Sequence, residues 1–437
     1  MKITFIRPTM VKGIRSSDAM HPLAFAVLAG LTPSDVAIEF FDERIEEIPQ
    51  QIQSDLVAIS VQTFTARRAY EIAKSFTGKK IPVVLGGYHP TFMSAEALQH
   101  ADSVVVGPAE GVWQNVIRDA KAGTLAKIYQ QEKPVGLGKI SYDRKIFNGK
   151  KYSSFVPVEF NRGCKYACEF CSVASFNQNR HASRPVSEVI EEIKCLESKT
   201  IAIIDDNIFA DEKNAVELFQ ALIPLKIKWG AQASIDIANH DDVLGLMARS
   251  GCVAVSIGFE SLNPKNLKKM NKSFNTVKND YQTAIKKIYG HGIMIQAFFL
   301  LGYDYDTADI FDKTVEFALQ NKFFLAGFNT LTPQPGTRLY KRYRLEKRLL
   351  DENWWLNEKY QYGEVMFRPR NMSAAQLKEG CIKARMQFYK YSQILNRSLT
   401  WRTTIGKLKN LGIYFAGNFI ARREILRKME LIHRCNS

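Results

Sequence analysis

Three cysteines lie close together in the sequence, at positions 164, 168 and 171, with the spacing C-x3-C-x2-C. They follow an apolar run, 155–160, so a short loop leaving a strand can bring all three sulfurs to one side. Thiolates are the usual ligands of iron-sulfur clusters. Three of them leave one iron of a four-iron cluster without a protein ligand, and an open metal position is where substrate or cofactor chemistry takes place. The spacing therefore favours a catalytic [4Fe-4S] cluster on Cys164, Cys168 and Cys171 over a zinc site with a distant fourth ligand.

The cysteine segment also carries an aromatic residue, Phe170, directly before its third cysteine. This pattern resembles the signature of the radical S-adenosylmethionine (SAM) enzymes. The resemblance implies that SAM chelates the open iron through its amino and carboxylate groups. It further implies that one electron from the cluster cleaves SAM to methionine and a 5'-deoxyadenosyl radical, and that Phe170 belongs to the cofactor-binding loop.

Short β-branched runs alternate with amphipathic segments downstream of the cysteines. Six strands are expected, at 155–160, 201–204, 227–231, 253–258, 294–301 and 326–331. Six such βα units favour a partial (β/α)6 TIM barrel, whose site must lie at the carboxyl ends of the strands.

Polar residues and glycines follow several of these strands. Acidic and amide oxygens are what an ammonium group requires, and the resemblance implies that the segment 205–207 binds the amino group of SAM. It likewise implies that Glu260 accepts hydrogen bonds from the ribose hydroxyls and that the backbone near Gly302 holds the adenine. The cofactor-binding residues expected in this part of the chain are Phe170, Asp205, Asp206, Asn207, Gln232, Glu260, Ser261 and Gly302. Each acid, taken alone, could instead be a helix N-cap.

The N-terminal region shows a βα alternation of its own. Strands are expected at 3–6, 36–41, 56–61, 83–85 and 103–106, with helical patterns between them. The order indicates a doubly wound, Rossmann-like parallel sheet, which binds its ligand beyond the carboxyl ends of the strands. Gly86, Gly87 and His89 lie at that edge. No G-x-G-x-x-G follows the first strand, so a dinucleotide is disfavoured.

The stretches 21–29, 55–63 and 84–91 resemble the cobalamin-binding domain that precedes the radical domain in many radical SAM proteins. The resemblance implies cobalamin contacts at Gly86, Gly87 and His89. The D-x-H-x-x-G motif that supplies a lower axial histidine elsewhere is absent, so we expect cobalamin without a histidine lower ligand; His21 and His89 are the only candidates at this edge. Glu110 follows Gly107 later than in relatives, which departs from the pattern. A domain that kept the fold and lost the cofactor is the alternative.

Composition limits the setting in which the protein works. Of its 437 residues 46% are hydrophobic and 24% charged, which is ordinary for a soluble enzyme, and the odd number of cysteines, 7, favours a reducing cytoplasm over a disulfide framework. The net charge is +16, and the segment 401–437 holds eight Lys or Arg against two Glu. Its basic and apolar residues are interleaved as in an interfacial helix, which predicts contact with an anionic membrane; packing of the same face onto the barrel is the alternative.

Four segments are therefore expected: a cobalamin-binding-like domain (1–125), a linker (126–150), a radical SAM core (151–340) and a helical extension (341–437) that can cap the barrel. The expected function is SAM cleavage and hydrogen abstraction from an unactivated carbon, followed by cobalamin-dependent methyl transfer. The substrate would be a small or lipid-like molecule and the reductant a flavodoxin or ferredoxin; nothing firm indicates nucleic acid. Cyclisation or rearrangement without methyl transfer, and a non-catalytic iron-sulfur sensor, are the alternatives.

Overall fold

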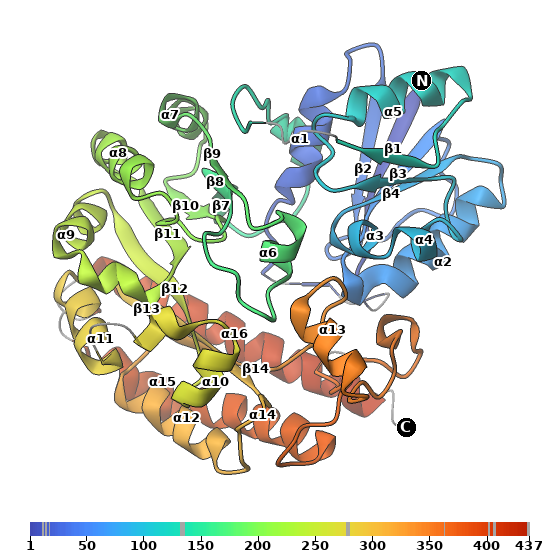
Figure 1. Cartoon of the computed structure of the whole chain (residues 1–437). Helices are drawn as coiled ribbons and strands as arrows, with labels where there is room; N and C mark the ends of the chain where they lie inside the picture. The colour runs from blue at the N-terminus through green and yellow to red at the C-terminus, as the bar shows by residue number, and fades with distance from the viewer. Residues whose placement is uncertain are drawn as a thin grey trace.

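Two six-stranded parallel sheets form the framework of the molecule, and a group of C-terminal helices runs below the second sheet (Figure 1). The computed structural model describes residues 1–10, 13, 15, 16, 18–131, 136–276, 280–361, 363–400, 403, 404 and 408–434; of residues 408, 409 and 428–434 it gives only the backbone. Among the described residues, no helix combines the length and the apolar composition that crossing a membrane requires.

The N-terminal sheet confirms the expected doubly wound fold. Its strand order is β2-β1-β3-β4-β5-β6, so the order reverses between β1 and β3, which is where such sheets bind ligands. Helices α1 and α5 pack on one face, where Phe25 and Trp113 join the core, and α2 packs on the other. The strands are β1 Lys2–Arg7, β2 Ala37–Asp42, β3 Leu56–Ser60, β4 Val83–Gly86, β5 Ser103–Val106 and β6 Ile128–Gln130. The helices are α1 Leu23–Leu31, α2 Ala66–Thr77, α3 Tyr88–Phe92, α4 Ser94–Ala97 and α5 Trp113–Ala122.

Strand β6 lies inside the stretch that we expected to be a linker. It pairs with β5 from Ile128 to Gln130, so the sheet extends beyond residue 125. Only Tyr129 of the three residues is buried. A strand this short has no alternation that a sequence pattern could reveal.

The second sheet is the partial barrel. Its order, β14-β13-β12-β11-β10-β7, follows the sequence from one edge to the other, and all its strand pairs are parallel. The strands are β7 Val156–Val158, β10 Thr200–Ile203, β11 Lys228–Ala233, β12 Cys252–Glu260, β13 Met294–Leu301 and β14 Leu325–Thr330. The intervening helices are α7 Val186–Lys194, α8 Glu212–Leu222, α9 Asp241–Arg249, α10 Pro264–Lys269, α11 Tyr281–Gly290 and α12 Ile310–Gln320. All six expected strands are present.

A two-stranded hairpin that the sequence did not reveal carries the cysteine loop. Strands β8 (Asn161–Gly163) and β9 (His181–Ser183) pair antiparallel, and the segment between them includes the cysteines and α6 (Ser172–Phe176). Gly163 has φ +87°, and a Cβ there would lie 2.0 Å from the carbonyl oxygen of Arg180. Only glycine therefore allows the chain to turn out of β8 into the cysteine loop.

The C-terminal helices close the open edge of the barrel. They are α13 Arg338–Leu345, α14 Ala374–Phe388, α15 Tyr391–Ser398 and α16 Leu408–Arg434. On α14, Arg385 Nε donates to the carbonyl oxygen of Phe328 at 2.9 Å. The Tyr389 hydroxyl accepts from the Ala326 N–H at 3.1 Å and donates to its carbonyl oxygen at 3.2 Å. These side chains satisfy backbone groups of the edge strand β14, which would otherwise be unpaired.

The segment after α13 packs on the N-terminal domain. Trp354 and Trp355 are buried in the same core cluster as α2. Trp355 Nε1 donates to the two carboxylate oxygens of Glu96, at 3.0 and 3.1 Å. The extension therefore joins the two sheets as well as capping the barrel.

Candidate functional site

The three cysteines lie in one loop between β8 and α6, and their thiols are close enough to influence one another electrostatically. Each thiol is half-buried. Burial raises the pKa of Cys164 and Cys171, and raises the pKa of Cys168 to about 12; the neighbouring thiols add to the shift at Cys168 and Cys171. In the described part of the chain, no three His, Cys, Asp or Glu side chains converge as they do around a single metal ion. Thiols on three corners of a multi-iron cluster lie further apart than ligands of one ion.

The loop fits a metal cluster on the chemistry of its donors. Thiolate is the form that binds metal, and three thiolates in this buried place require compensating positive charge. The iron of a cluster supplies that charge. The ammonium group of Lys272, a largely buried residue just after α10, adds a further positive charge near Cys168. This charge lowers the pKa of the Cys168 thiol and so favours the thiolate.

Glu169, between the second and third cysteines, ties the loop to α13. Arg342 donates to its carboxylate from Nε at 2.6 Å and from Nη2 at 3.2 Å. The hydroxyl of Tyr303 also donates to this carboxylate. The backbone of Glu169 accepts from the Leu339 N–H at 3.0 Å and donates to the Met270 carbonyl at 2.9 Å. The loop is thus fixed from several sides.

The expected SAM-binding segment after β10 supports the cysteine hairpin. Asp205 is fully buried, and its Oδ1 accepts from the Phe160 N–H at 2.8 Å. Asp206 accepts from the Gly163 N–H at 2.8 Å. Asn207 hydrogen-bonds Ser234 at 2.9 Å and the thiol of Cys164. Asp205 thus holds the chain just before β8, whereas Asp206 and Asn207 lie directly beside the cysteines.

The other expected rim residues lie at the ends of β11, β12 and β13. Gln232 is exposed on β11. Glu260 is buried and pairs with Lys272 Nζ at 3.0 Å, and Ser261 Oγ accepts from the Asn263 N–H at 3.1 Å. Gly302 has φ +98°, and a Cβ there would lie 2.3 Å from Leu377 of α14. The structure thus brings Asp206, Asn207, Glu260 and the cysteines into one neighbourhood, while their contacts with SAM stay a prediction.

At the edge of the N-terminal sheet, the glycine loop faces the cysteine hairpin. Gly86 ends β4, and Gly87 precedes Tyr88, whose ring stacks on Phe176 of α6 at 4.4 Å between ring centroids. Burial raises the pKa of Tyr88, and the charges of Asp206 and Cys171 raise it further. The Tyr88 hydroxyl is therefore close to the loop that would hold the cluster.

The two histidines near this edge serve packing. His89 is fully buried, and its Nε2 lies 3.0 Å from the Tyr70 hydroxyl and 3.0 Å from Glu96 Oε1. His21 stacks on Phe147 at 4.7 Å. His89 Nε2 is thus held in a hydrogen-bond network inside the domain, and a contact of His89 with a cofactor stays a prediction.

Two protein families and several known proteins are similar to this chain. The Radical SAM superfamily model matches residues 158–318, and the B12 binding domain model matches residues 13–117. The bacteriochlorophyllide d C-12(1)-methyltransferase of Chlorobaculum tepidum is 32% identical over 414 residues, which cover 91% of this chain and 90% of the relative. The chain belongs to the radical SAM superfamily and to its branch with a B12 binding domain. It is an enzyme of that family, whose cofactors are a [4Fe-4S] cluster, SAM and cobalamin.

Other members of the superfamily share the whole arrangement. The anaerobic magnesium-protoporphyrin IX monomethyl ester cyclase of Cereibacter sphaeroides is 24% identical, over 92% of this chain and 72% of the relative. The solved structure of TsrM from Kitasatospora setae with cobalamin and a [4Fe-4S] cluster has a TM-score of 0.63 at 14% identity, covering 79% of this chain and 75% of that one. OxsB with aqua-cobalamin and SAM has a TM-score of 0.65 at 13% identity and covers 98% and 80%. These structures share the fold of this radical SAM protein.

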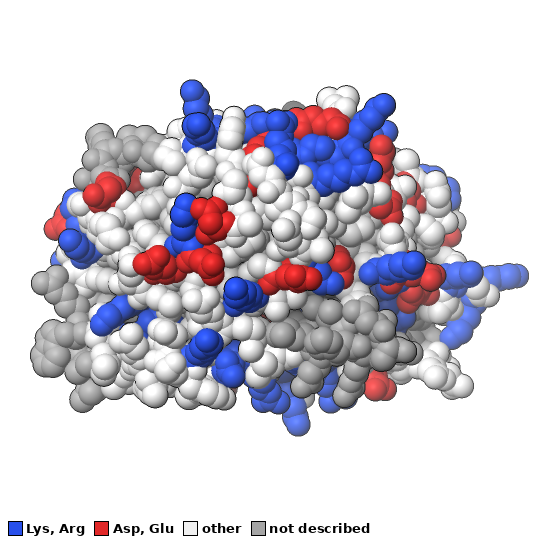
Figure 2. All heavy atoms as spheres, turned by 90° about the horizontal axis from the view of Figure 1, so that it is seen from below, with Lys and Arg blue, Asp and Glu red and all other residues white. Residues whose placement is uncertain are grey.

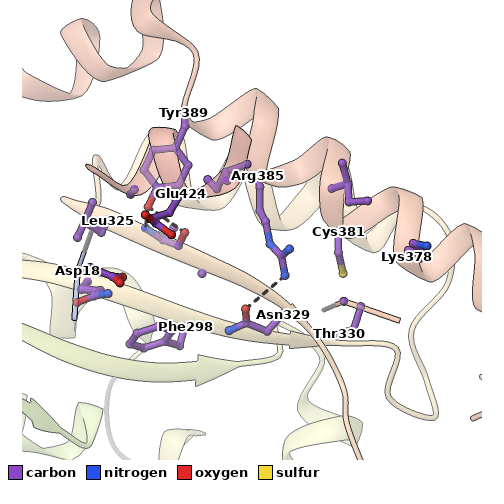
Figure 3. A pocket seen from close by; sticks show the side chains of 17 residues that line it. Asp18, Phe298, Leu325, Asn329, Thr330, Lys378, Cys381, Arg385, Tyr389 and Glu424 are labelled. Carbon is purple, nitrogen blue, oxygen red and sulfur yellow. Dashed lines mark hydrogen bonds between the residues drawn. The ribbon is translucent and has the colours of Figure 1, made fainter. Parts of the chain in front are cut away.

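A pocket of about 190 Å³ opens between β13, β14 and the helices α14 and α16 (Figure 3). Phe298 and Leu325 line it from the strands. Asp18, from the loop after β1, and Glu424 lie toward one end, whereas Arg385 and Lys378 lie toward the other (Figure 3). Charges of opposite sign are thus separated along the pocket.

Sequence reasoning missed several residues of this site. Lys272, Arg342 and Tyr88 act through contacts between distant segments, and the first two stand in no motif. Tyr88 alone had a local signal, because it directly follows the glycine pair at the ligand edge.

Proposed function

We propose that this protein is a methylase that cleaves SAM, removes hydrogen from an unactivated carbon and places a methyl group there with the help of cobalamin. One observation carries the proposal: the glycine edge of the B12 binding domain meets the cysteine hairpin directly, through the stack of Tyr88 on Phe176. The two cofactor sites therefore border one space, as methyl transfer to a radical carbon requires.

The protein's own residues would bind and enclose these groups. Cys164, Cys168 and Cys171 would hold the cluster, Asp206 and Asn207 the amino group of SAM, and Gly86 and Gly87 the corrin. When bound, the cofactors supply the radical and the methyl group. The aromatic pair between the domains excludes water from the space in which a carbon radical would form.

The test begins with anaerobic reconstitution of the full chain with iron and sulfide. We expect one four-iron cluster, and 5'-deoxyadenosine on addition of dithionite and SAM. Replacing Cys164, Cys168 or Cys171 by Ala should abolish both, whereas Cys195→Ala, at an exposed cysteine, should change neither. Unchanged SAM cleavage in all three variants would refute the assignment.

Cobalamin binding is tested with supplied hydroxocobalamin and electron paramagnetic resonance of the Co(II) state. Because His89 is enclosed in its own network, we expect no nitrogen superhyperfine splitting from an axial imidazole, and the same spectrum from His89→Asn. Failure to bind any corrin would instead favour cyclisation or rearrangement, which the similarity to a cyclase supports.

We propose the pocket between β13, β14 and α14 as the substrate site. It runs along β14 from Leu325 to Thr330 and so reaches the carboxyl end of the strand, where barrel enzymes carry their chemistry. Arg385→Gln should weaken substrate binding more than SAM cleavage, so that 5'-deoxyadenosine still forms while methylated product falls. Equal loss of both would argue against a substrate contact.

A membrane contact is proposed for the surface of α15 and α16. Tyr391, Leu395, Leu399 and Phe419 are 59%, 58%, 61% and 49% exposed, and the rings of Tyr391 and Phe419 are 6.3 Å apart. On the face seen from below, Lys and Arg are scattered together with Asp and Glu between areas of uncharged residues (Figure 2). Apolar side chains among basic ones suit an anionic bilayer surface.

The first half of α16, however, is a packing element. Tyr414 and Asn418 are buried against β14 and α15, so removing the tail would damage the barrel. The variant Leu395→Ser/Leu399→Ser/Phe419→Ser tests the contact without that damage. It should float less with liposomes of anionic lipid at low salt than wild type or the control Leu350→Ser. Equal flotation, or none by wild type, would exclude this contact. Residues 401, 402, 405–407 and 435–437 of the predicted tail lie outside the described residues.

A further inference from the structure

Helix α13 forms hydrogen bonds and an ion pair with the segment that contains the second and third cysteines. Three of its residues reach that segment: Arg338 donates to the carbonyl of Ala167, Leu339 N–H to the carbonyl of Glu169, and Arg342 to the Glu169 carboxylate through two nitrogens. No other described helix outside the cysteine hairpin makes this set of contacts. The guanidinium and carboxylate planes thus meet in the bidentate geometry that gives both strength and orientation.

A second carboxylate, that of Asp304, also pairs with Arg342 and fixes its orientation. Arg342 Nη1 donates to Asp304 Oδ2 at 2.7 Å, and Asp304 is also paired with Arg348 and Lys269, each at 2.5 Å. The Asp304 carboxylate is 1% exposed, and its pKa is lowered because these cations outweigh its burial. Arg342 therefore cannot turn away from Glu169 without leaving a buried partner.

The ion pair of Arg342 and Glu169 affects the net charge around the cysteine loop. Glu169 directly follows Cys168 and lies two residues before Cys171, and Arg342 neutralises its carboxylate. Reduction of a cluster adds one negative charge, and a nearby unpaired carboxylate makes that addition harder. Net charge and hydrogen bonding around a cluster are main determinants of its reduction potential.

We propose that Arg342 is a positioning residue of the radical SAM site: by pairing with Glu169 it fixes the cysteine loop and keeps the bound cluster reducible. This inference rests on the proposed function, because it requires that the three cysteines hold a cluster. It assigns a catalytic consequence to α13, which the sequence presents only as the start of a helical extension.

The test measures the midpoint potential of the reconstituted cluster by an EPR-monitored redox titration with dithionite, without substrate. Arg342→Gln leaves the Glu169 carboxylate without its cationic partner, although the Tyr303 hydroxyl still donates to it, and should lower the potential. Glu169→Gln should raise it, and the double variant should return it close to the wild-type value. Arg342→Lys keeps the positive charge but cannot form the bidentate hydrogen bond. Its cluster potential should therefore stay near that of wild type, even if its thermal unfolding temperature falls.

The matched control is Arg344→Gln, on the same helix, whose guanidinium is 62% exposed and pairs with Glu352 at 2.9 Å. It should leave the potential unchanged. The proposal would be overturned if the midpoint potential stayed unchanged in Arg342→Gln and Glu169→Gln, or if it moved in the same direction in both. A loop that is merely loosened would shift the potential in the same way whichever charge is removed. If Arg342→Gln holds no cluster, the opposite shift in Glu169→Gln and the recovery in the double variant still decide. Absence of a cluster in wild type would instead refute the proposed function.

Discussion

At the scale of single residues, buried carboxylates hold the backbone around the candidate site. Asp306 is the clearest case. Its Oδ2 accepts from the N–H groups of Gly302 and Tyr303, at 2.9 and 3.0 Å, and its Oδ1 accepts from Asn266 at 2.7 Å. These bonds shape the turn after β13, in which the resemblance to radical SAM enzymes places the adenine.

The burial of Asp306 predicts a pH dependence. Burial raises its pKa from 3.8 to about 6, although its hydrogen bonds oppose the shift. The folded state therefore holds the proton more tightly than the unfolded state, so this residue's contribution to stability is largest near pH 4 and is lost as pH rises through 6, by about 3 kcal/mol in all. Urea unfolding from pH 4 to 7 should show wild type losing stability relative to Asp306→Asn over this range.

The control for this prediction is Asp312→Asn, an exposed carboxylate on α12. Its unfolding curve should run parallel to wild type at each pH. If Asp306→Asn also ran parallel to wild type, the Asp306 carboxyl would have the same pKa in the folded and the unfolded protein, which would contradict the prediction.

The three candidate ligands of the cluster could be recognised from the sequence because their spacing is local. Cys164, Cys168 and Cys171 fall within one short loop, so no tertiary information was needed. Lys272 and Arg342 could not be predicted in the same way, because their partners Glu260 and Glu169 come from other elements. Asp205 had the right type and place for a ligand contact, but its complete burial and its bond to the Phe160 N–H could not be predicted from the sequence.

At the scale of elements, the open edge of the barrel depends on side chains of α14. Tyr389→Phe removes the hydroxyl that pairs with Ala326 N–H and leaves that buried group without a partner, which costs about 1–3 kcal/mol. We expect a lower denaturation midpoint and faster hydrogen exchange at the Ala326 amide. Tyr391→Phe, at a ring that is 59% exposed, should change neither. Unaltered exchange in Tyr389→Phe would show that water replaces the hydroxyl.

The strands could be predicted well, since both sheets are parallel and bury continuous apolar runs. The hairpin of β8 and β9 could not, because its three-residue strands show no alternation and its pairing brings together segments on either side of the cysteines. The same holds for β6. The period of α14 indicated a helix but could not indicate that Arg385 and Tyr389 would satisfy the backbone of β14.

At the scale of the whole molecule, Trp355 fastens the C-terminal extension to the N-terminal domain. Its ring is 2% exposed in the core beside α2, and truncating a buried aromatic costs about 3–5 kcal/mol. Trp355→Ala should therefore release the contact, and limited proteolysis should cut the connection between the two sheets, 131–155, faster than in wild type. Leu345→Ala, on α13 at 85% exposure, serves as the control. An unchanged digestion pattern would mean that other contacts suffice.

Helix α13 touches both halves of the molecule: Tyr340 lies in the core of the N-terminal domain, and Leu339 and Arg342 hold the cysteine loop. One rigid element thus serves as a common reference for two cofactor sites on separate sheets. If a corrin bound at the first sheet orders this helix and thereby strengthens SAM binding at the second, thermodynamic reciprocity requires SAM to strengthen corrin binding by the same factor. Loading either site first would then prepare the other, so that the radical is generated most readily in a protein already holding the methyl donor.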